Sequence, residues 1–518
     1  MKHTMKSLAQ PASFCFAAAF LFTGIAQAQG RPSGFWTAPD ANAAHTNWQK
    51  AEKQISTDTV TKDFKFLWKL KLGSGETKST SFTEPLLYPG LITGRGFKDM
   101  ALLADQNTVY SVDSELGELI WKKDFPGAHS PCGNIQIVTE PPPVIHFGPP
   151  PTAPKPGAPA PPPPPRRPPE PPLPRSQRRV GASPGGGYFG LRGVYVLTSD
   201  GYIHEQIMAT GLDYAPPVKF LPAPLSGSTF GLNMNEKVAY TESGSGCHNA
   251  ADAVYSIDLN TPDYPVKNYK VEKASLGGLT GPAIGPDGTA YVYLGGVFAL
   301  DKDLKVKDSY TPTTPGKSLN AGPVVFNYKE KVLIAAPGAN GTLVLLDAAS
   351  LGGPDHHTPL AQTPPLAKAG KRAPWEALAS SPDPSGGAWI FASISGSIES
   401  DVKFPNSNGP ATHGSIVAFK VEEKDGQICL TPAWVSRDLI NPAPPAIANG
   451  VVFALDGGNA SHHATLYALD AATGKQLYSS EDAIQTYTHL AGMSIGDGHV
   501  FFTTHDNTLY SFGIPLEH

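Results

Sequence analysis

The sequence predicts an all-β fold, an eight-bladed β-propeller of four-stranded antiparallel blades that an N-terminal strand closes. Three observations carry this prediction: a strand phrase that recurs along the chain, Asn-Gly and Asp-Gly turns before it, and a composition rich in turn formers. Of the 518 residues, 53 are Gly and 53 are Pro, while only 16% are charged. Such a composition is typical of many short strands joined by tight loops.

The recurring phrase is a six-residue apolar strand that usually ends in Asp. Clear copies occupy Thr108–Asp113, Ala253–Asp258, Gly296–Asp301, Thr342–Asp347, Thr465–Asp470 and Thr508–Gly513, and weaker copies occupy Ser415–Lys420 and the surroundings of Tyr202–His204. Large apolar residues alternate onto both faces, which predicts strands covered on both sides, as when sheets stack around a ring. The eight copies therefore predict eight blades.

Turn residues divide each unit into four strands. Before several copies, Asp287, Asn449 and Asp497 are each followed by Gly, a pair that adopts the positive φ angles of a tight hairpin. After the phrase, Asp113–Gly117 and Asp470–Gly474 predict a second turn, in which Asp accepts main-chain N–H bonds and Gly is left-handed. An outer strand with an aromatic residue is expected to follow.

The N-terminal part of the chain is predicted to close the ring. The last phrase ends at Gly513 with no outer strand after it, whereas Phe64–Leu72 is an apolar strand that carries Trp68. We expect this strand to be the fourth of the last blade, which would also remove an exposed sheet edge.

The predicted organisation is a signal peptide at 1–28, an N-terminal extension at 29–63 and the propeller at 64–518. Basic residues precede an apolar run at 14–25, and Ala26-Gln27-Ala28 is a small-x-small cleavage site. The run is shorter than the ~20 residues of a membrane span. We therefore expect an exported protein, periplasmic or extracellular, with no transmembrane segment in the mature chain. The formal net charge of −5 gives no reason to propose nucleic acid as a partner, and a monomer is expected.

Residues 141–187 interrupt the second blade with proline runs and scattered arginines. This composition cannot build a packed core, so we expect polyproline II or a disordered insertion. One interpretation is a docking arm for a cell-envelope protein. The other, which we favour, is a tolerated surface insertion.

The stretch Leu466–Tyr478 resembles the repeat of pyrroloquinoline-quinone (PQQ) type propellers, in which a strand ending in Ala-Leu-Asp precedes Thr-Gly and a strand with Trp. Here Tyr478 replaces that Trp, and Leu116 replaces the Thr in the first blade. The stretch Ser199–Pro222 is similar to one in exported bacterial proteins of the PQQ-binding-like group. The resemblance covers Phe64 to the end and implies the fold more firmly than any chemistry.

A quinone-dependent dehydrogenase of this kind would imply an acidic calcium site, an Asp base, a stacking Trp and commonly two adjacent cysteines. The sequence has no adjacent cysteines and no Cys-x-x-Cys-His for haem. The candidates for binding PQQ and calcium are Trp375, which could stack on a ring, and Glu376, which could offer carboxylate oxygens. Both precede a blade, where they could face the channel. The alternative, which we favour, is a packed aromatic and a solvated carboxylate.

Three cysteines follow the signal region. Cys132 and Cys247 lie in Gly/Ser-rich loops and are the candidate disulfide in an oxidising compartment, where His248 beside Cys247 would not be needed as a catalytic partner. Cys429 has a strand-like context and is expected to be a buried small hydrophobe.

Other polar residues are weaker candidates. Adjacent histidines on a strand point to opposite faces, so neither pair chelates a metal alone. Asp383 lies in a Pro-Asp-Pro turn. The histidines considered for a metal site are His356, His357, His462 and His463, with His489 or His505 as added ligands.

The sequence thus favours an exported binding or scaffold protein that recognises a protein or small ligand through its loops or central channel. The alternative is a PQQ- and calcium-dependent oxidoreductase that acts on an alcohol or sugar. No Gly-x-Ser-x-Gly elbow, phosphate-binding loop or His-Glu-x-x-His helix is present, so no catalytic residue is assigned.

Overall fold

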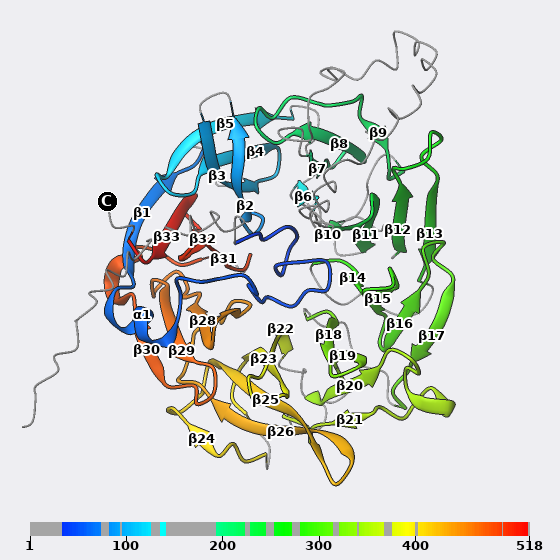
Figure 1. Cartoon of the computed structure of the whole chain (residues 1–518), viewed down its shortest axis with the longest axis vertical. Coiled ribbons are helices and arrows are strands. Elements are labelled where there is room, and N and C mark those ends of the chain that lie inside the picture. The colour runs from blue at the N-terminus through cyan, green and yellow to red at the C-terminus, as the bar shows by residue number, and fades with distance from the viewer. Residues whose placement is uncertain are drawn as a thin grey trace, which may run out of the picture. The chain divides into compact units, whose positions relative to one another are not determined.

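Eight sheets surround a common centre in the computed structural model (Figure 1). The structure describes residues 34–73, 82–93, 96–125, 135–140, 193–222, 228–244, 253–271, 280–313, 321–338, 341–366, 375–398, 402–488 and 491–515. These belong to one compact unit, Ser33–His518. The prediction of an eight-bladed propeller with four-stranded antiparallel blades is confirmed.

The blades are numbered in chain order, and each runs from an inner to an outer strand. The strands of blades 1 to 4 are β2 (Leu86–Thr93), β3 (Gly96–Ala104), β4 (Thr108–Asp113) and β5 (Glu118–Asp124); β6 (Gln136–Thr139), β7 (Gly193–Leu197), β8 (Tyr202–Ile207) and β9 (Val218–Lys219); β10 (Ser228–Asn235), β11 (Val238–Gly244), β12 (Ala253–Asp258) and β13 (Val266–Lys270); and β14 (Ala283–Ile284), β15 (Ala290–Tyr293), β16 (Val297–Leu300) and β17 (Val306–Tyr310).

Blades 5 to 8 repeat this order, with a short parallel fifth strand, β24, added to blade 6. Their strands are β18 (Val324–Tyr328), β19 (Lys331–Pro337), β20 (Leu343–Asp347) and β21 (Ala361–Gln362); β22 (Trp375–Pro382), β23 (Ala388–Ser395), β25 (Gly414–Lys424), β26 (Gln427–Val435) and β24 (Asn406–Ser407); β27 (Ala446–Ala448), β28 (Val451–Asp456), β29 (Thr465–Asp470) and β30 (Gln476–Ser479); and β31 (Ser494–Gly496), β32 (His499–Thr504), β33 (Thr508–Gly513) and β1 (Lys65–Lys71).

The recurring phrase forms the third strand of every blade. In β4 and β33 each residue is buried, because neighbouring blades cover both faces of the sheet. This arrangement explains why the phrase lacks the simple alternation of polar and apolar residues that a half-exposed strand shows.

The N-terminal strand closes the ring as predicted. Strand β1 pairs antiparallel with β33, with Lys65 opposite Gly513 and Lys71 opposite Thr508. A register shift between Phe66 and Trp68 bends this outer strand. The last blade therefore joins β31, β32 and β33 from one end of the propeller sequence with β1 from the other.

The predicted turns are largely confirmed. Gly117 and Gly474 are left-handed, with φ of 68° and 70°. The Asp470 carboxylate accepts the main-chain N–H of Thr473 at 2.8 Å. In the inner hairpin of blade 7, both Asn449 and Gly450 have positive φ.

Tryptophans of the outer strands pack against the next blade in the ring. Three such indoles lie against the left-handed glycine of the next blade, in the pairs Trp68–Gly117, Trp121–Gly211 and Trp434–Gly474. The indole N–H of Trp121 donates to the Met208 carbonyl at 2.9 Å, and that of Trp434 donates to the Ala471 carbonyl at 2.8 Å. A glycine is needed at each turn because a Cβ atom would overlap the indole.

Helices are minor elements of the structure. The helix α1 (Thr57–Lys62) begins after Ser56, whose side chain and that of Thr59 form a capping box. The 3₁₀ turn η3 (Gly353–Asp355) lies between β20 and β21 within blade 5, and η4 (Glu481–Ala483) lies in the connection from blade 7 to blade 8. Within the described ranges, no helix combines the length and the apolar character that a bilayer span requires.

Candidate functional site

The segment Gly34–Gln54, named the plug here, runs through the centre of the ring (Figure 1, darkest blue). Sequence analysis placed these residues in the N-terminal extension and did not predict their position. The plug contacts the inner part of all eight blades in chain order. Its main chain pairs with β2, where Trp36 and Leu87 exchange hydrogen bonds of 3.0 and 2.9 Å.

Further plug contacts follow from blade 2 to blade 8. The plug carbonyls of Thr37, Ala43, Ala44, Thr46 and Asn47 accept main-chain N–H bonds from Thr139, Ile284, Val325, Ser380 and Ile447, respectively. The Asn233 side chain of blade 3 donates to the Ala43 carbonyl, and the Gln49 side chain donates to the Ile495 carbonyl of blade 8. The plug thus supplies hydrogen-bond partners to main-chain groups of the inner strands, which would otherwise line an open channel.

The plug contains strained backbone. Asp40, Ala41, His45 and Asn47 have φ between 52° and 80°, a region that residues other than Gly adopt only at a cost. Such residues persist where surrounding contacts hold them, and they cluster at ligand sites. Two of the four, Asp40 and His45, line a pocket.

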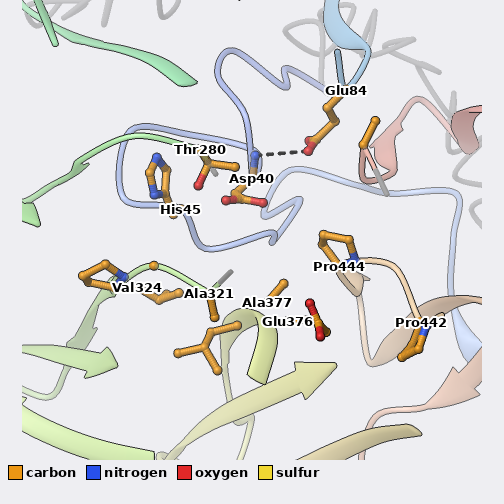
Figure 2. A pocket seen from close by; sticks show the side chains of 14 residues that line it. Asp40, His45, Glu84, Thr280, Ala321, Val324, Glu376, Ala377, Pro442 and Pro444 are labelled. Atoms are coloured by element: carbon orange, nitrogen blue, oxygen red, sulfur yellow. Dashed lines mark hydrogen bonds between the residues drawn. The ribbon is translucent and has the colours of Figure 1, made fainter. Parts of the chain in front are cut away.

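This axial pocket lies between the plug and the blades. Asp40 and His45 of the plug face Glu376 and Ala377 across it, and Glu84 lies at its rim (Figure 2). The remaining described walls are mainly apolar, with Ala321, Pro323, Val324, Leu378, Pro442 and Pro444. The cavity of about 60 Å³ has room for about four water molecules.

The structure separates the two residues that sequence analysis proposed for cofactor binding. Glu376 lies at a register shift between Trp375 and Ala377, which turns its side chain into the pocket. Its carboxylate accepts the Ser395 hydroxyl at 2.7 Å. Trp375 is 1% exposed and packs in the hydrophobic core between blades 5 and 6. The cofactor role of both residues stays a prediction.

Glu84 holds the plug against blade 1. Its carboxyl group accepts the Trp36 indole N–H and, at 3.4 Å, the main-chain N–H of Asp40. Burial raises the pKa of Glu84 well above its ordinary value, and the Asp40 carboxylate raises it further. The protonated form of Glu84 is thereby favoured.

His45 has a buried ring nitrogen that lacks a hydrogen-bond partner among the described residues. The side chain is 1% exposed, and burial lowers its pKa, which favours the neutral ring. The Asn233 amide nitrogen lies 3.1 Å from Nε2 and also donates to the carbonyls of Ala43 and Pro282, at 2.8 Å each. Among the described residues, Nδ1 has no hydrogen-bond partner.

The pH dependence of stability is expected to report on Glu84. Its folded pKa is raised, so the folded state binds this proton more tightly than the unfolded chain. Its contribution to the free energy of unfolding is greatest below the ordinary glutamate pKa and is lost as pH rises through the folded pKa. Thermal melts at about pH 5 and about pH 8 should therefore differ less for Glu84→Gln than for the parent chain. Equal pH dependence of the two melting temperatures would contradict this assignment.

The histidines considered for a metal lie apart in exposed connections. His356 contacts Asp308 at 3.0 Å, and His463 contacts Asp482 at 3.2 Å. The ring of His505 lies against Tyr487, and His489 lies outside the described residues. No group of three or more His, Cys, Asp or Glu in the described ranges is arranged to hold a metal ion.

Asp383 and the cysteines have structural placements. Asp383 forms an ion pair with Lys420 at 2.6 Å across blade 6. Cys132 and Cys247 lie outside the described residues, so their disulfide stays a prediction. The expectation that Cys429 is buried is wrong: it is a half-buried free thiol, because β26 is an outer strand with one open face.

Solved quinoprotein dehydrogenases share this fold. A quinohemoprotein alcohol dehydrogenase from Comamonas testosteroni superposes with a TM-score of 0.55 at 13% identity, over 95% of this chain and 82% of that chain. One from Pseudomonas putida HK5 gives 0.54 at 13%, over 94% and 81%. A europium-containing methanol dehydrogenase gives 0.51 at 12%, over 93% and 98%. No family model and no curated protein sequence matches the chain.

The structural likeness confirms the resemblance to PQQ-type propellers at the level of the fold. At sequence identities of 12–13%, the activity and cofactor of these enzymes cannot be assigned to this chain. The cofactor of such enzymes must therefore be tested against this chain's own residues.

The described residues of the axial pocket do not fit PQQ. This quinone is a planar, fused-ring tricarboxylate, whereas the pocket presents Asp40, Glu84 and Glu376 and no Lys or Arg among its described lining residues. Carboxylates brought together in a partly buried site repel strongly. The plug also occupies the axis and leaves a cavity too small for fused rings.

Proposed function

We propose that this chain is an exported binding propeller that recognises a small molecule at the axial pocket. One observation carries the proposal: the plug fills the channel and leaves a small pocket lined by His45, whose buried Nδ1 has no hydrogen-bond partner among the described residues. A buried polar atom without a partner is costly, so a ligand that formed a hydrogen bond with this nitrogen would gain affinity. Export is supported by the signal-like pattern of residues 1–28.

The strained plug backbone supports the same proposal. Asp40 and His45 keep left-handed conformations that cost energy, and both side chains line the pocket. We therefore propose a ligand-binding role in place of the oxidoreductase alternative, whose quinone the described pocket does not fit.

Quinone binding tests this proposal directly. The chain from residue 29 onward, mixed with PQQ and Ca²⁺ and passed through a desalting column, is expected to retain no quinone absorbance and to show no dye-linked oxidation of alcohols or sugars. A quinoprotein dehydrogenase treated in parallel is the positive control. Retention of one equivalent of quinone would overturn the binding role and restore the oxidoreductase.

A further inference from the structure

We propose that residues 141–192 of this chain dock on a surface of the chain's own ring, an acidic and apolar strip formed by blades 1 to 3. This strip, named the turn strip here, lies at the end of the blades where the inner hairpins and the turns into the outer strands meet. Its described residues are 96–99, 113–119, 140, 193, 205–213, 235–238 and 258–266. The inference goes beyond the axial pocket and does not depend on it.

Residues 141–192 leave and rejoin the ring in the middle of the turn strip. They connect β6 and β7 of blade 2, which lies between blades 1 and 3 (Figure 1). The main-chain N–H of Glu140 donates to the Gly193 carbonyl at 3.5 Å, and the Glu140 carboxylate accepts the Tyr195 hydroxyl at 2.6 Å. Both ends of the segment are therefore fixed within the strip.

The turn strip continues from one blade to the next. Gly211, in the outer turn of blade 2, lies against the Trp121 indole of blade 1. Lys237, in the inner hairpin of blade 3, forms ion pairs with Glu140 at 3.3 Å and with Glu205 of β8 at 3.6 Å. Contacts between neighbouring blades thus join the three sets of turns into one surface.

Large apolar side chains are exposed along the turn strip. Six of the ten exposed large hydrophobic residues in the described part of the chain belong to it, whereas blades 6 and 7 have none. Single exposed apolar residues are ordinary, but a run of them over three neighbouring blades marks an interaction surface. Proline-rich segments dock on surfaces of this kind. The six residues are Phe97, Leu116, Leu119, Leu212, Tyr264 and Val266.

The charges of the turn strip and of the segment are opposite. Four exposed carboxylates lie on the strip, those of Glu115, Glu118, Glu236 and Asp263. Burial raises the pKa of Glu115, and the neighbouring Asp99 carboxylate raises it further, because negative charge accumulates in this part of blade 1. Residues 141–192 carry seven Lys or Arg against one Glu, a formal net charge of +6, although the whole chain has −5. The segment therefore complements the strip.

The tether and the composition of the segment reduce the cost of docking. Because both ends are fixed on blade 2, the segment meets the strip at an effective concentration of about the millimolar range, so weak contacts suffice. Of its 52 residues, 20 are Pro, whose fixed φ leaves less backbone entropy to lose.

Limited tryptic digestion of the full exported chain tests the docking. Cleavage after Arg175 and Arg179 is followed by mass spectrometry at about 20 mM and about 500 mM NaCl, since salt screens the attraction between exposed charges. A synthetic peptide of residues 173–182 corrects for the effect of salt on trypsin itself. We expect the segment to be cleaved more slowly than the peptide at low salt and to approach its rate at high salt. Equal rates for segment and peptide at both salt concentrations would overturn the proposal.

Two double variants separate the turn strip from the rest of the ring. Glu118→Gln with Glu236→Gln removes two carboxylates of the strip and should speed low-salt cleavage about fivefold. Glu330→Gln with Glu423→Gln makes the same change of charge in the turns of blades 5 and 6 and should leave the rate unchanged. Thermal melts establish that both variants are folded. Equal cleavage rates for the two variants would refute the assignment of the strip.

Protein concentration distinguishes the chain's own segment from that of a second copy. A segment docked on its own ring is protected equally at about 1 µM and about 50 µM protein, because its effective concentration is set by the tether. Protection that appeared only at the higher concentration would place the segment on a second copy and overturn the proposal.

Discussion

Removal of the plug is expected to destabilise the whole ring. A chain that lacks residues 29–50 loses eight main-chain hydrogen bonds to the inner strands, as well as the buried Trp36 indole. At about 1 kcal/mol each, the hydrogen bonds alone amount to about 8 kcal/mol. This figure is comparable to the net stability of a typical domain. We expect the melting temperature to fall by more than about 10 °C.

A chain that lacks only residues 29–33 is the control for this truncation, because it keeps every plug contact. A synthetic peptide of residues 29–54, added in excess to the truncated chain, should raise the melting temperature as its concentration rises, since it binds only the folded ring. If the truncated chain melted at the temperature of the control, the plug would contribute nothing to stability, contrary to the contacts described.

The position of the plug could not be predicted from the sequence, whereas the blades could. The blades could be predicted because each repeats one phrase, and because Gly and Asp mark turns by local chemistry. The plug forms no more than two main-chain hydrogen bonds with any one blade, so its partners are spread along the whole chain and it has no period of its own. The only local signal is its two tryptophans, Trp36 and Trp48, in a short segment before the first strand. Large aromatics in a short extension predict burial, although they do not say where.

The same limit applies to the axial pocket. Glu376 could be proposed because it was expected just before a blade, and it lies at the second position of the inner strand β22, near the axis. Its neighbour Trp375 was proposed on the same ground and lies in the core, because the register shift that separates the two has no sequence signature. Asp40, His45 and Glu84 could not be proposed at all, since their roles depend on the path of the plug.

The ligand hypothesis and the fold thus rest on different parts of the chain. The repeat builds the ring, while a segment outside the repeat fills its centre and contributes Asp40 and His45 to the pocket. The likeness to quinoprotein dehydrogenases therefore gives the fold without the chemistry.

Gly474→Ala is expected to show that contacts between blades depend on the tryptophan–glycine pairs. An added Cβ would lie 2.5 Å from the Trp434 ring and 2.8 Å from the Asn408 amide, at a φ of +70°. The left-handed backbone costs about 1–2 kcal/mol for Ala, and the overlap adds about 1–3 kcal/mol. Chemical denaturation should therefore show a loss of about 2–5 kcal/mol in the free energy of unfolding.

Gly450→Ala is the matched control for this prediction, because Gly450 lies in the same blade at a φ of +79° with nothing within 4 Å of an added Cβ. It should cost only the backbone penalty of about 1–2 kcal/mol. Adding Trp434→Leu should reduce the further cost of Gly474→Ala and leave that of Gly450→Ala unchanged, since only the first pair is in contact. An equal loss of unfolding free energy for Gly474→Ala and Gly450→Ala would show that the indole moves aside at no cost. The blades would then be held together by their apolar faces alone.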